Sequence, residues 1–153
     1  MISSDALVLL DTNILIHYIR GDRVAQQIEI DYNLKKRSPR PLIAYVTLGE
    51  IESLALQFGW GDKKITQMRK LCQQLTIVPI ERWQIVEKYA EIDRFSQKEC
   101  GSAKNMGKND LWIAAIAAVT GAYLITSDRD FEHLAGIKIN CIKIEPKTGI
   151  TLK

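Results

Sequence analysis

The chain has 153 residues, of which 46% are apolar and 25% are charged, and its formal net charge is +3. This composition is typical of a soluble globular protein, and we expect one domain spanning residues 1–153. No apolar run approaches the roughly 20 residues that a membrane-spanning helix needs, and the N-terminus lacks the features of a signal peptide. We therefore expect a cytoplasmic protein with no membrane association.

The three cysteines do not indicate a disulfide framework or a metal site. Cys72, Cys100 and Cys141 are far apart in the sequence, and no CxxC or Cys/His spacing is present. Free cysteines are commonly buried, so we expect Cys72 and Cys141 to be small apolar core residues.

The first half of the chain begins with a strand. Residues 6–10 form a continuous apolar run, which predicts a strand covered on both faces, as in a parallel sheet. A helix over 13–20, capped by Thr12 or Asn13, is expected to follow it. The further elements expected here are a short helix within 22–33, a surface loop at 35–41, a strand at 42–46, a helix over 48–58 that begins with a capping box formed by Thr47 and Glu50, and a helix over 62–75 capped by Asp62.

The second half continues the alternation of strands and helices. We expect a helix over 110–120, capped by Asn109, to be central and buried, because it is apolar nearly all round. The other expected elements are a strand at 76–80 that Pro79 ends or places at an edge, a helix over 81–97, a loop at 98–108, a strand at 122–126, a turn with a short helix at 127–134, and an edge strand at 137–145. This order predicts a three-layer α/β/α sandwich around a parallel sheet.

Four acidic residues stand at the boundaries of these elements: Asp11, Glu50, Asp110 and Asp128. In open α/β sheets, ligands bind outside the carboxyl ends of the strands, so we expect the four carboxylates to meet there. Several carboxylates held close together repel one another unless a cation is present. Oxygen ligands favour Mg²⁺ or Mn²⁺, and neither His17 nor His133 is needed, so we expect both histidines to be structural.

Such a site suits hydrolysis of a phosphodiester bond by one or two metal ions. Hydroxyl groups of Thr12, Thr126 and Ser127, together with Asn13, could orient the carboxylates. Each acid also has a structural interpretation when it is taken alone. Glu50 could serve simply as a helix cap, Asp110 is favoured by the helix dipole, and Asp128 could belong to a turn. Asp11 is the hardest to explain structurally, because it ends a wholly apolar strand.

Four segments resemble one known family: LLDTN, VTLGEI, NDLWIAA and ITSDRDF. In order and spacing, over roughly residues 7–145, the chain resembles the PIN domain, and most closely the VapC-type toxins of toxin–antitoxin pairs. The resemblance implies a five-stranded parallel sheet and a Mg²⁺-dependent endoribonuclease. Asp11, Glu50, Asp110 and Asp128 would be its acidic quartet, with Asp11 and Asp110 as the main metal ligands.

The resemblance also implies a supporting hydroxyl from Thr126 or Thr12. It further implies a homodimer, and a small antitoxin that blocks the pocket. Asp130 is assigned a supporting position behind the ligands, since the family varies there. The basic segment around 31–41 is larger than a minimal toxin needs. It could bind RNA, bind the antitoxin or do neither.

RNA contacts are expected mainly from basic side chains. Lys104, Lys108 and Arg129 are candidate phosphate contacts, as is the cluster of Lys35, Lys36, Arg37 and Arg40. Trp60, in Gly-Trp-Gly, is expected to be the most exposed tryptophan, and Trp112 to be core. The alternatives are a PIN-like module that binds RNA or protein without turnover, and a PIN nuclease of RNA processing without an antitoxin. Receiver and haloacid-dehalogenase patterns need further acids that are missing here.

Overall fold

A computed structural model of the protein describes residues 2–99, 101 and 104–153. Five parallel strands form one sheet in the order β3-β2-β1-β4-β5. The strands are β1 (Val8–Leu10), β2 (Leu42–Ala44), β3 (Thr76–Val78), β4 (Tyr123–Thr126) and β5 (Asn140–Lys143). The parallel sheet with helices on both faces confirms the three-layer fold that the sequence predicts.

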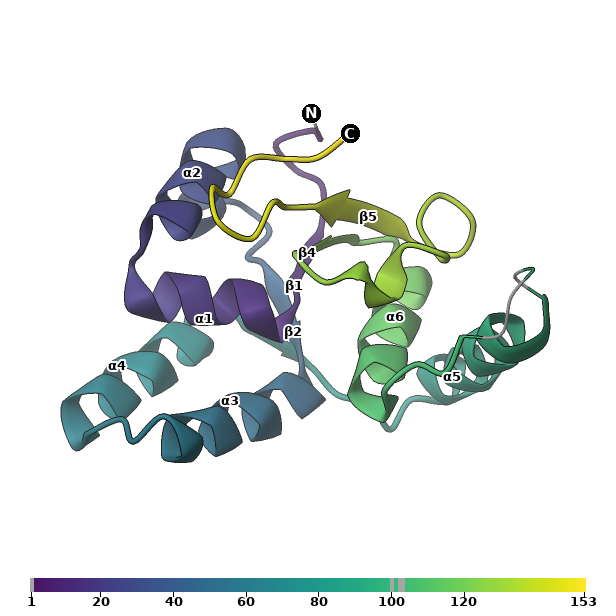
Figure 1. The fold of residues 1–153 in the computed structure, drawn as a ribbon, viewed down its shortest axis with the longest axis horizontal. Coiled ribbons are helices and arrows are strands. Elements are labelled where there is room, and N and C mark those ends of the chain that lie inside the picture. The colour runs from purple at the N-terminus through teal and green to yellow at the C-terminus, as the bar shows by residue number, and fades with distance from the viewer. Residues whose placement is uncertain (1, 100, 102–103) are drawn as a thin grey trace.

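Four helices precede β3 and pack on one face of the sheet through buried residues such as Ile14, Ile28, Ile51 and Met68. They are α1 (Thr12–Arg20), α2 (Arg23–Tyr32), α3 (Tyr45–Gln57) and α4 (Asp62–Gln73). Figure 1 shows α1, α2 and α4 on one side of the sheet and α5 and α6 on the other. A short 3₁₀ turn, Leu34–Lys36, follows α2 within the expected surface loop.

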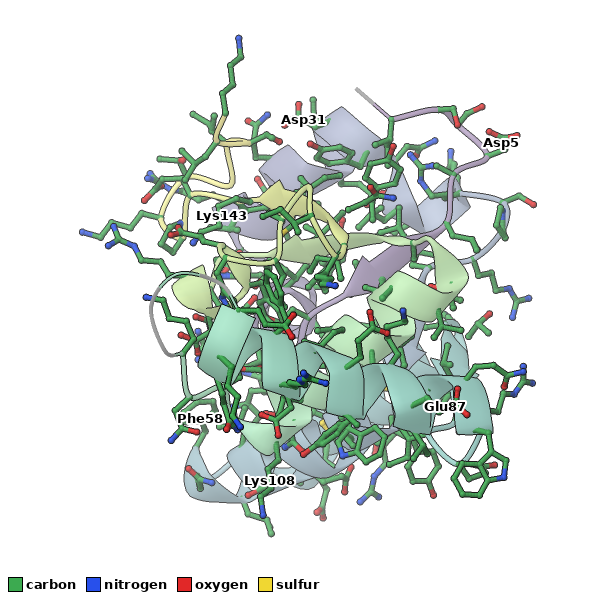
Figure 2. All side chains as sticks on the ribbon, turned by 90° about the vertical axis from the view of Figure 1, so that its right-hand side faces the viewer. Asp5, Asp31, Phe58, Glu87, Lys108 and Lys143 are labelled. Atoms are coloured by element: carbon green, nitrogen blue, oxygen red, sulfur yellow. The ribbon has the colours of Figure 1, made fainter. Side chains whose placement is uncertain are left out.

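The opposite face is covered by α5 (Trp83–Arg94), which continues into a π-helical turn at Phe95–Glu99, and by α6 (Lys108–Thr120). The expectation that α6 is central is confirmed, because six of its residues from Leu111 to Ala117 are buried. Figure 2, which views the molecule from the side of α5, shows Glu87 on the outer surface of that helix. Helix α5 therefore covers part of α6.

The middle strand of the sheet fixes the position of Asp11. Strand β1 pairs with both β2 and β4, and Leu10 lies opposite Ile125 in the register. The pairing continues past the end of β1, because the backbone N–H of Asp11 donates to the carbonyl of Ile125 at 3.1 Å. Asp11 is thereby held beside Thr126, the last residue of β4.

Several expected helix starts were wrong by one to three residues. Helix α1 is capped by Asp11 itself rather than by Thr12 or Asn13. Helix α3 begins directly after β2 with Ala44 as its N-cap, so Thr47 and Glu50 do not form a capping box. Likewise, Gly61 and Gly107 are the N-caps of α4 and α6, where Asp62 and Asn109 were expected. Glu50 therefore lies in the second turn of its helix, facing the sheet edge.

The cysteines and histidines mostly match expectation. Cys72 is buried and Cys141 is partly buried, whereas Cys100 lies outside the described residues. His17 pairs with Asp22 at 2.7 Å, and His133 Nε2 lies 2.8 Å from the Ser96 hydroxyl.

The tryptophans do not all match. Trp60 is only partly exposed, because it packs against the buried cluster on the α1 face of the sheet, and Lys64 Nζ lies 4.4 Å from its ring centre. Trp83 is 75% exposed instead, so the expectation for Trp60 was wrong. Trp112 is partly buried and packs on Tyr89 with ring centres 4.2 Å apart. No helix in the described part of the chain is both long and apolar enough to span a membrane.

Helix α6 offers a direct test of the core. Ile113 has no exposed surface, so Ile113→Ala leaves a cavity and is expected to lower the free energy of unfolding by roughly 2–5 kcal/mol. Val119 on the same helix is 40% exposed, and Val119→Ala should change it by less than about 0.5 kcal/mol. Urea unfolding followed by circular dichroism measures both values, and equal losses would contradict the burial of α6.

Candidate active site

Five carboxylates gather where the strands end. Asp11 follows β1 directly, and Asp128 and Asp130 follow β4. Glu50 comes from α3, which begins directly after β2, and Asp110 lies in the first turn of α6. The acids come from segments that are far apart in the sequence, and the parallel sheet brings them to one edge.

Asp11 is the most firmly held of these acids. Only 4% of its surface is exposed, and each carboxylate oxygen accepts at least one hydrogen bond. Oδ1 accepts from the backbone N–H of Thr12 at 2.8 Å. Oδ2 accepts from the Thr126 hydroxyl at 2.7 Å and from Asn13 Nδ2 at 3.2 Å. The side chain therefore has a single orientation at the end of the strand.

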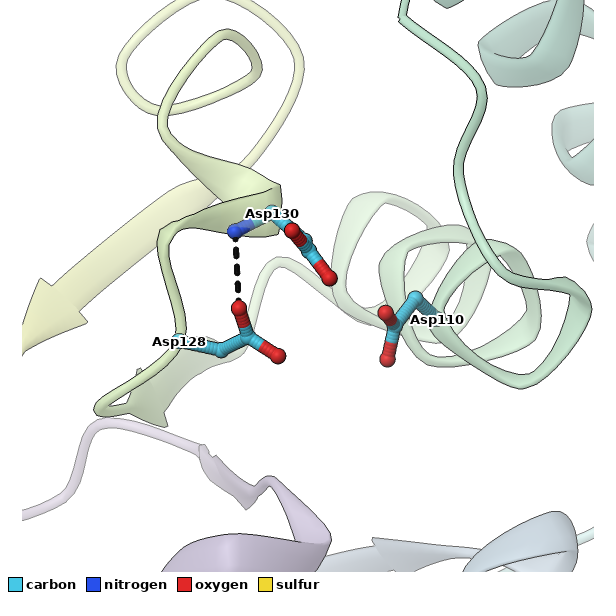
Figure 3. Close-up of side chains that lie close together, drawn as sticks. All are labelled: Asp110, Asp128 and Asp130. Carbon is cyan, nitrogen blue, oxygen red and sulfur yellow. Dashed lines mark hydrogen bonds between the residues drawn. The ribbon is translucent and has the colours of Figure 1, made fainter.

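Thr126 links Asp11 to the loop that carries two further acids. Its hydroxyl donates to Asp11 and accepts from the backbone N–H of Asp128 at 2.9 Å. The carboxylate of Asp128 then accepts from the backbone N–H of Asp130 at 3.0 Å, the bond drawn in Figure 3. One buried hydroxyl thus sets the spacing between Asp11 and the Asp128 loop.

Asp110 faces Asp128 and Asp130 across the site. One carboxylate oxygen from each of these three residues lies within 4.8 Å of the others. Figure 3 shows Asp110 reaching from the start of α6 toward the two acids of the loop after β4. Such spacing lets one cation contact oxygens from more than one of the three side chains.

Glu50 is held by a pair of buried threonines. The Thr12 hydroxyl donates to Glu50 Oε1 at 2.8 Å, and its oxygen lies 3.1 Å from that of Thr47. Thr47 has no exposed surface, and sequence reasoning assigned it only to a capping box. Its position three residues before Glu50, on the same face of α3, is the signal that could have placed it near the site.

Burial and mutual repulsion make two of these acids hard to ionise. Burial is the main cause that raises the pKa of Asp11 to about 6, with Asp128 and Glu50 adding to it. The hydrogen bonds from Thr126 and Thr12 oppose that rise. The pKa of Asp110 is raised to about 7 by burial first, and then by Asp11, Asp128, Asp130 and Glu50. A positive charge in the site would relieve both effects.

The described basic side chains do not pair with the acids of the site. Among the described residues, none of the salt bridges involves Asp11, Glu50, Asp110, Asp128 or Asp130. The donor set consists of carboxylate oxygens supported by hydroxyls, which is the set that Mg²⁺ and Mn²⁺ prefer. The residues present therefore fit a hard divalent cation.

The comparison with family models decides the classification. The model of the PIN domain matches residues 8–137, which is most of the chain. The protein belongs to the PIN domain family. No curated protein sequence matches the chain.

Solved structures with similar folds come from several bacteria. A chain of a toxin–antitoxin complex from Klebsiella pneumoniae is 26% identical, with a TM-score of 0.62, over 85% of this chain and 92% of that one. A chain of VapBC-1 from nontypeable Haemophilus influenzae is 24% identical with a TM-score of 0.66, over 90% and 97%. A chain of DNA-bound VapBC from Salmonella typhimurium is 21% identical with a TM-score of 0.67, over 90% and 98%. The last two likenesses show the fold alone.

The basic residues proposed for RNA contact come from the segment before Asp110 and from the loop after β4. Lys104, Lys108 and Arg129 are exposed, and none of the salt bridges among the described residues involves them. Lys108 is the first residue of α6 and lies at the surface of the molecule in Figure 2. Lys104 acts from a distance on His133, where its charge helps burial to lower the pKa of the imidazole.

The raised pKa values predict how stability depends on pH in the absence of metal. Asp110 and Asp11 bind protons more tightly in the folded protein than in the unfolded chain, where their ordinary pKa is 3.8. Their contribution to stability is therefore present at low pH and is lost as pH rises through about 6 to 7. The melting temperature of the metal-free wild type should fall between pH 5 and pH 8. That of metal-free Asp110→Asn should fall by less over the same range.

The exposed Asp62 provides the matched control, because Asp62→Asn should follow the wild-type pH profile. Adding Mg²⁺ at pH 8 should raise the melting temperature of the wild type and of Asp62→Asn, but much less that of Asp110→Asn. Differential scanning fluorimetry measures both effects. Identical profiles for the wild type and Asp110→Asn would contradict the raised pKa of Asp110.

Proposed function

We propose that the protein is a divalent-metal-dependent endoribonuclease in which residues 1–153 act as one catalytic domain. The observation that carries the proposal is the gathering of five carboxylates at one sheet edge with no salt-bridge partner among the described residues. Membership of the PIN domain family supports nuclease chemistry at this edge. We assign the protein to the cytoplasm.

Asp11 and Asp110 are proposed as the main metal ligands, with Glu50 and Asp128 completing the catalytic quartet. When bound, Mg²⁺ or Mn²⁺ supplies activation of a water molecule and neutralisation of charge on the scissile phosphate. The chain's own contribution is orientation. The Thr126 hydroxyl and the Thr12 backbone N–H fix Asp11, and the Thr12 hydroxyl fixes Glu50.

Asp130 and Asn13 are proposed as supporting residues. Asp130 is exposed and lies close to Asp110 and Asp128, so its charge strengthens the pull on a cation. Asn13 donates to Asp11 and accepts from the backbone N–H of Ser127 at 3.4 Å. These contacts hold the loop after β4 in place while substrate binds.

The proposed substrate is single-stranded RNA. Lys104, Lys108 and Arg129 are exposed cations near the acidic edge and would contact phosphates of a strand that crosses it. The exposed ring of Trp83, at the start of α5, is available to stack on an unpaired base. The choice of RNA over DNA is supported by the resemblance to VapC-type toxins.

We further propose that the protein is the toxin of a toxin–antitoxin pair, and that it works as a homodimer. The similarity to a chain of a toxin–antitoxin complex from Klebsiella pneumoniae supports the pairing with a small antitoxin. Large apolar side chains such as Ile30, Leu56 and Ile137 are exposed on the isolated chain. Partner subunits would remove such surface from water.

Cleavage of RNA tests the catalytic assignment. Asp11→Asn and Asp110→Asn should each lower the cleavage rate of a single-stranded RNA in Mg²⁺ by roughly 100-fold or more, because each removes a charged ligand. Asp62→Asn should cleave like the wild type, and EDTA should abolish cleavage. Gel analysis of end-labelled RNA, with the matching DNA alongside, measures the rates. Undiminished cleavage by Asp110→Asn would overturn the assignment, and no cleavage by the wild type would favour a binding module.

Expression in bacteria tests the toxin assignment. Induction of the wild type should arrest growth, whereas Asp110→Asn should not, because the arrest depends on cleavage. Co-expression of the small protein encoded beside the gene should restore growth. Colony counts after induction measure the effect. Arrest by wild type and Asp110→Asn alike would show that the toxicity does not come from RNA cleavage.

A further inference from the structure

A cavity of about 590 Å³ lies on the α1 and α4 side of the sheet, apart from the acidic edge. None of the five site carboxylates lines it. Pro41 and Leu75, which do line it, come immediately before β2 and β3, toward the amino ends of these strands. Leu10, the last residue of β1, also lines the cavity, but no site carboxylate does, so the cavity is a separate space beneath the acidic edge. Its volume is within the usual range for small-molecule sites, roughly 300–1,000 Å³.

The cavity combines an apolar floor with a basic rim. Leu10, Leu15 and Leu34 are almost fully buried and provide part of the floor. The charged side chains that line it are all basic, namely Lys35, Arg37 and Arg40. The amides of Gln73 and Gln74, at the end of α4, add neutral polar groups. A ligand that matches this lining carries negative charge at one end and an apolar body at the other.

The basic charges in the rim are not neutralised by salt bridges. Among the described residues, none of the salt bridges involves Lys35, Arg37 or Arg40. Arg37 donates from Nη1 to the carbonyls of Ser3 and Ala6 and from Nη2 to that of Tyr32, which are neutral acceptors. Its Nε is buried and has no hydrogen-bond partner in the described part of the chain. A buried donor without an acceptor is costly, so the described groups of the chain do not fully satisfy this guanidinium.

Two acidic residues, Glu29 and Asp5, lie near the rim but do not line the cavity. Glu29 accepts from the Tyr18 hydroxyl at 2.7 Å and from the backbone N–H of Lys35 at 2.9 Å, and it lines a neighbouring cavity instead. Asp5 is exposed, and its pKa is lowered chiefly by the hydrogen bond from the Ser3 hydroxyl and to a lesser extent by the charge of Arg37. The lining itself therefore carries three positive charges and no negative one.

We propose that this cavity is a second binding site, which takes a small organic anion that carries an oxyanion group on an apolar body. The head is a phosphate or a carboxylate that the basic rim recognises, and the body rests on the leucine floor. This assignment gives the basic segment at 35–40 a role that does not depend on RNA cleavage. The proposed anion site does not depend on the proposed nuclease activity, and each can be tested without the other.

The fluorescent probe 8-anilinonaphthalene-1-sulfonate tests the site, since it joins an oxyanion to apolar rings. It should bind the wild type with a stoichiometry of one, and Arg40→Gln and Lys35→Gln should each weaken binding by about tenfold through loss of a charge-assisted contact. Lys36→Gln is the matched control, because Lys36 belongs to the same basic segment but does not line the cavity. Asp110→Asn should bind the probe like the wild type, which separates this site from the nuclease. Melting temperatures confirm that each variant is folded.

Competition identifies the natural head group. Displacement of the probe by adenosine monophosphate would assign a phosphate, and displacement by decanoate a carboxylate. Inorganic phosphate at the same concentration should not displace it, because it has no apolar body. Equal probe binding in Arg40→Gln, Lys35→Gln and Lys36→Gln would overturn the proposal. The fraction of protein that carries a bound probe should not depend on protein concentration when free probe is in excess. A fall in that fraction as protein concentration rises would also overturn the proposal, by showing that a second copy covers the cavity.

Discussion

Like charges brought together at one sheet edge are the constraint on which the rest of this structure depends. Asp11 and Asp110 are held where burial and neighbouring carboxylates both oppose ionisation. Such an arrangement is unfavourable in itself, so the surrounding fold must hold it in place. The buried face of α6, with Ile113 and Ile116, anchors the helix that presents Asp110. Core packing thus offsets the repulsion at the site.

Hydroxyl groups do the finer positioning. Thr126 and Thr12 each contact a carboxylate and also lie within a strand or a helix that the core fixes. A hydroxyl adds no charge, so it can orient an acid without competing for a cation. Basic side chains would neutralise the acids and fill the space that a cation needs. Threonine, rather than lysine or arginine, therefore contacts the acids here, because it orients them without neutralising them.

The strands and the acids at their ends could be read from the sequence, because both depend on local patterns. The exact starts of helices could not, because pairing between distant strands decides them. Tyr45 and Val46 favour a strand by propensity, yet they begin α3, since β3 pairs with β2 only as far as Val78 opposite Ala44. Similarly, Asp11 caps α1 because its N–H still pairs with Ile125. Exposure of Trp60 and Trp83 also depended on packing that no local pattern encodes.

The order of the strands has a consequence for synthesis of the protein. Strand β1 lies in the middle of the sheet but is made first, and its neighbour β4 ends only at residue 126. Asp11 therefore emerges from the ribosome long before Thr126 and Asp128, which complete its surroundings. During most of translation the acids are separated along an unfinished chain. Products that terminate before this point lack the loop after β4, so the acidic edge can form only after residue 130 has been made.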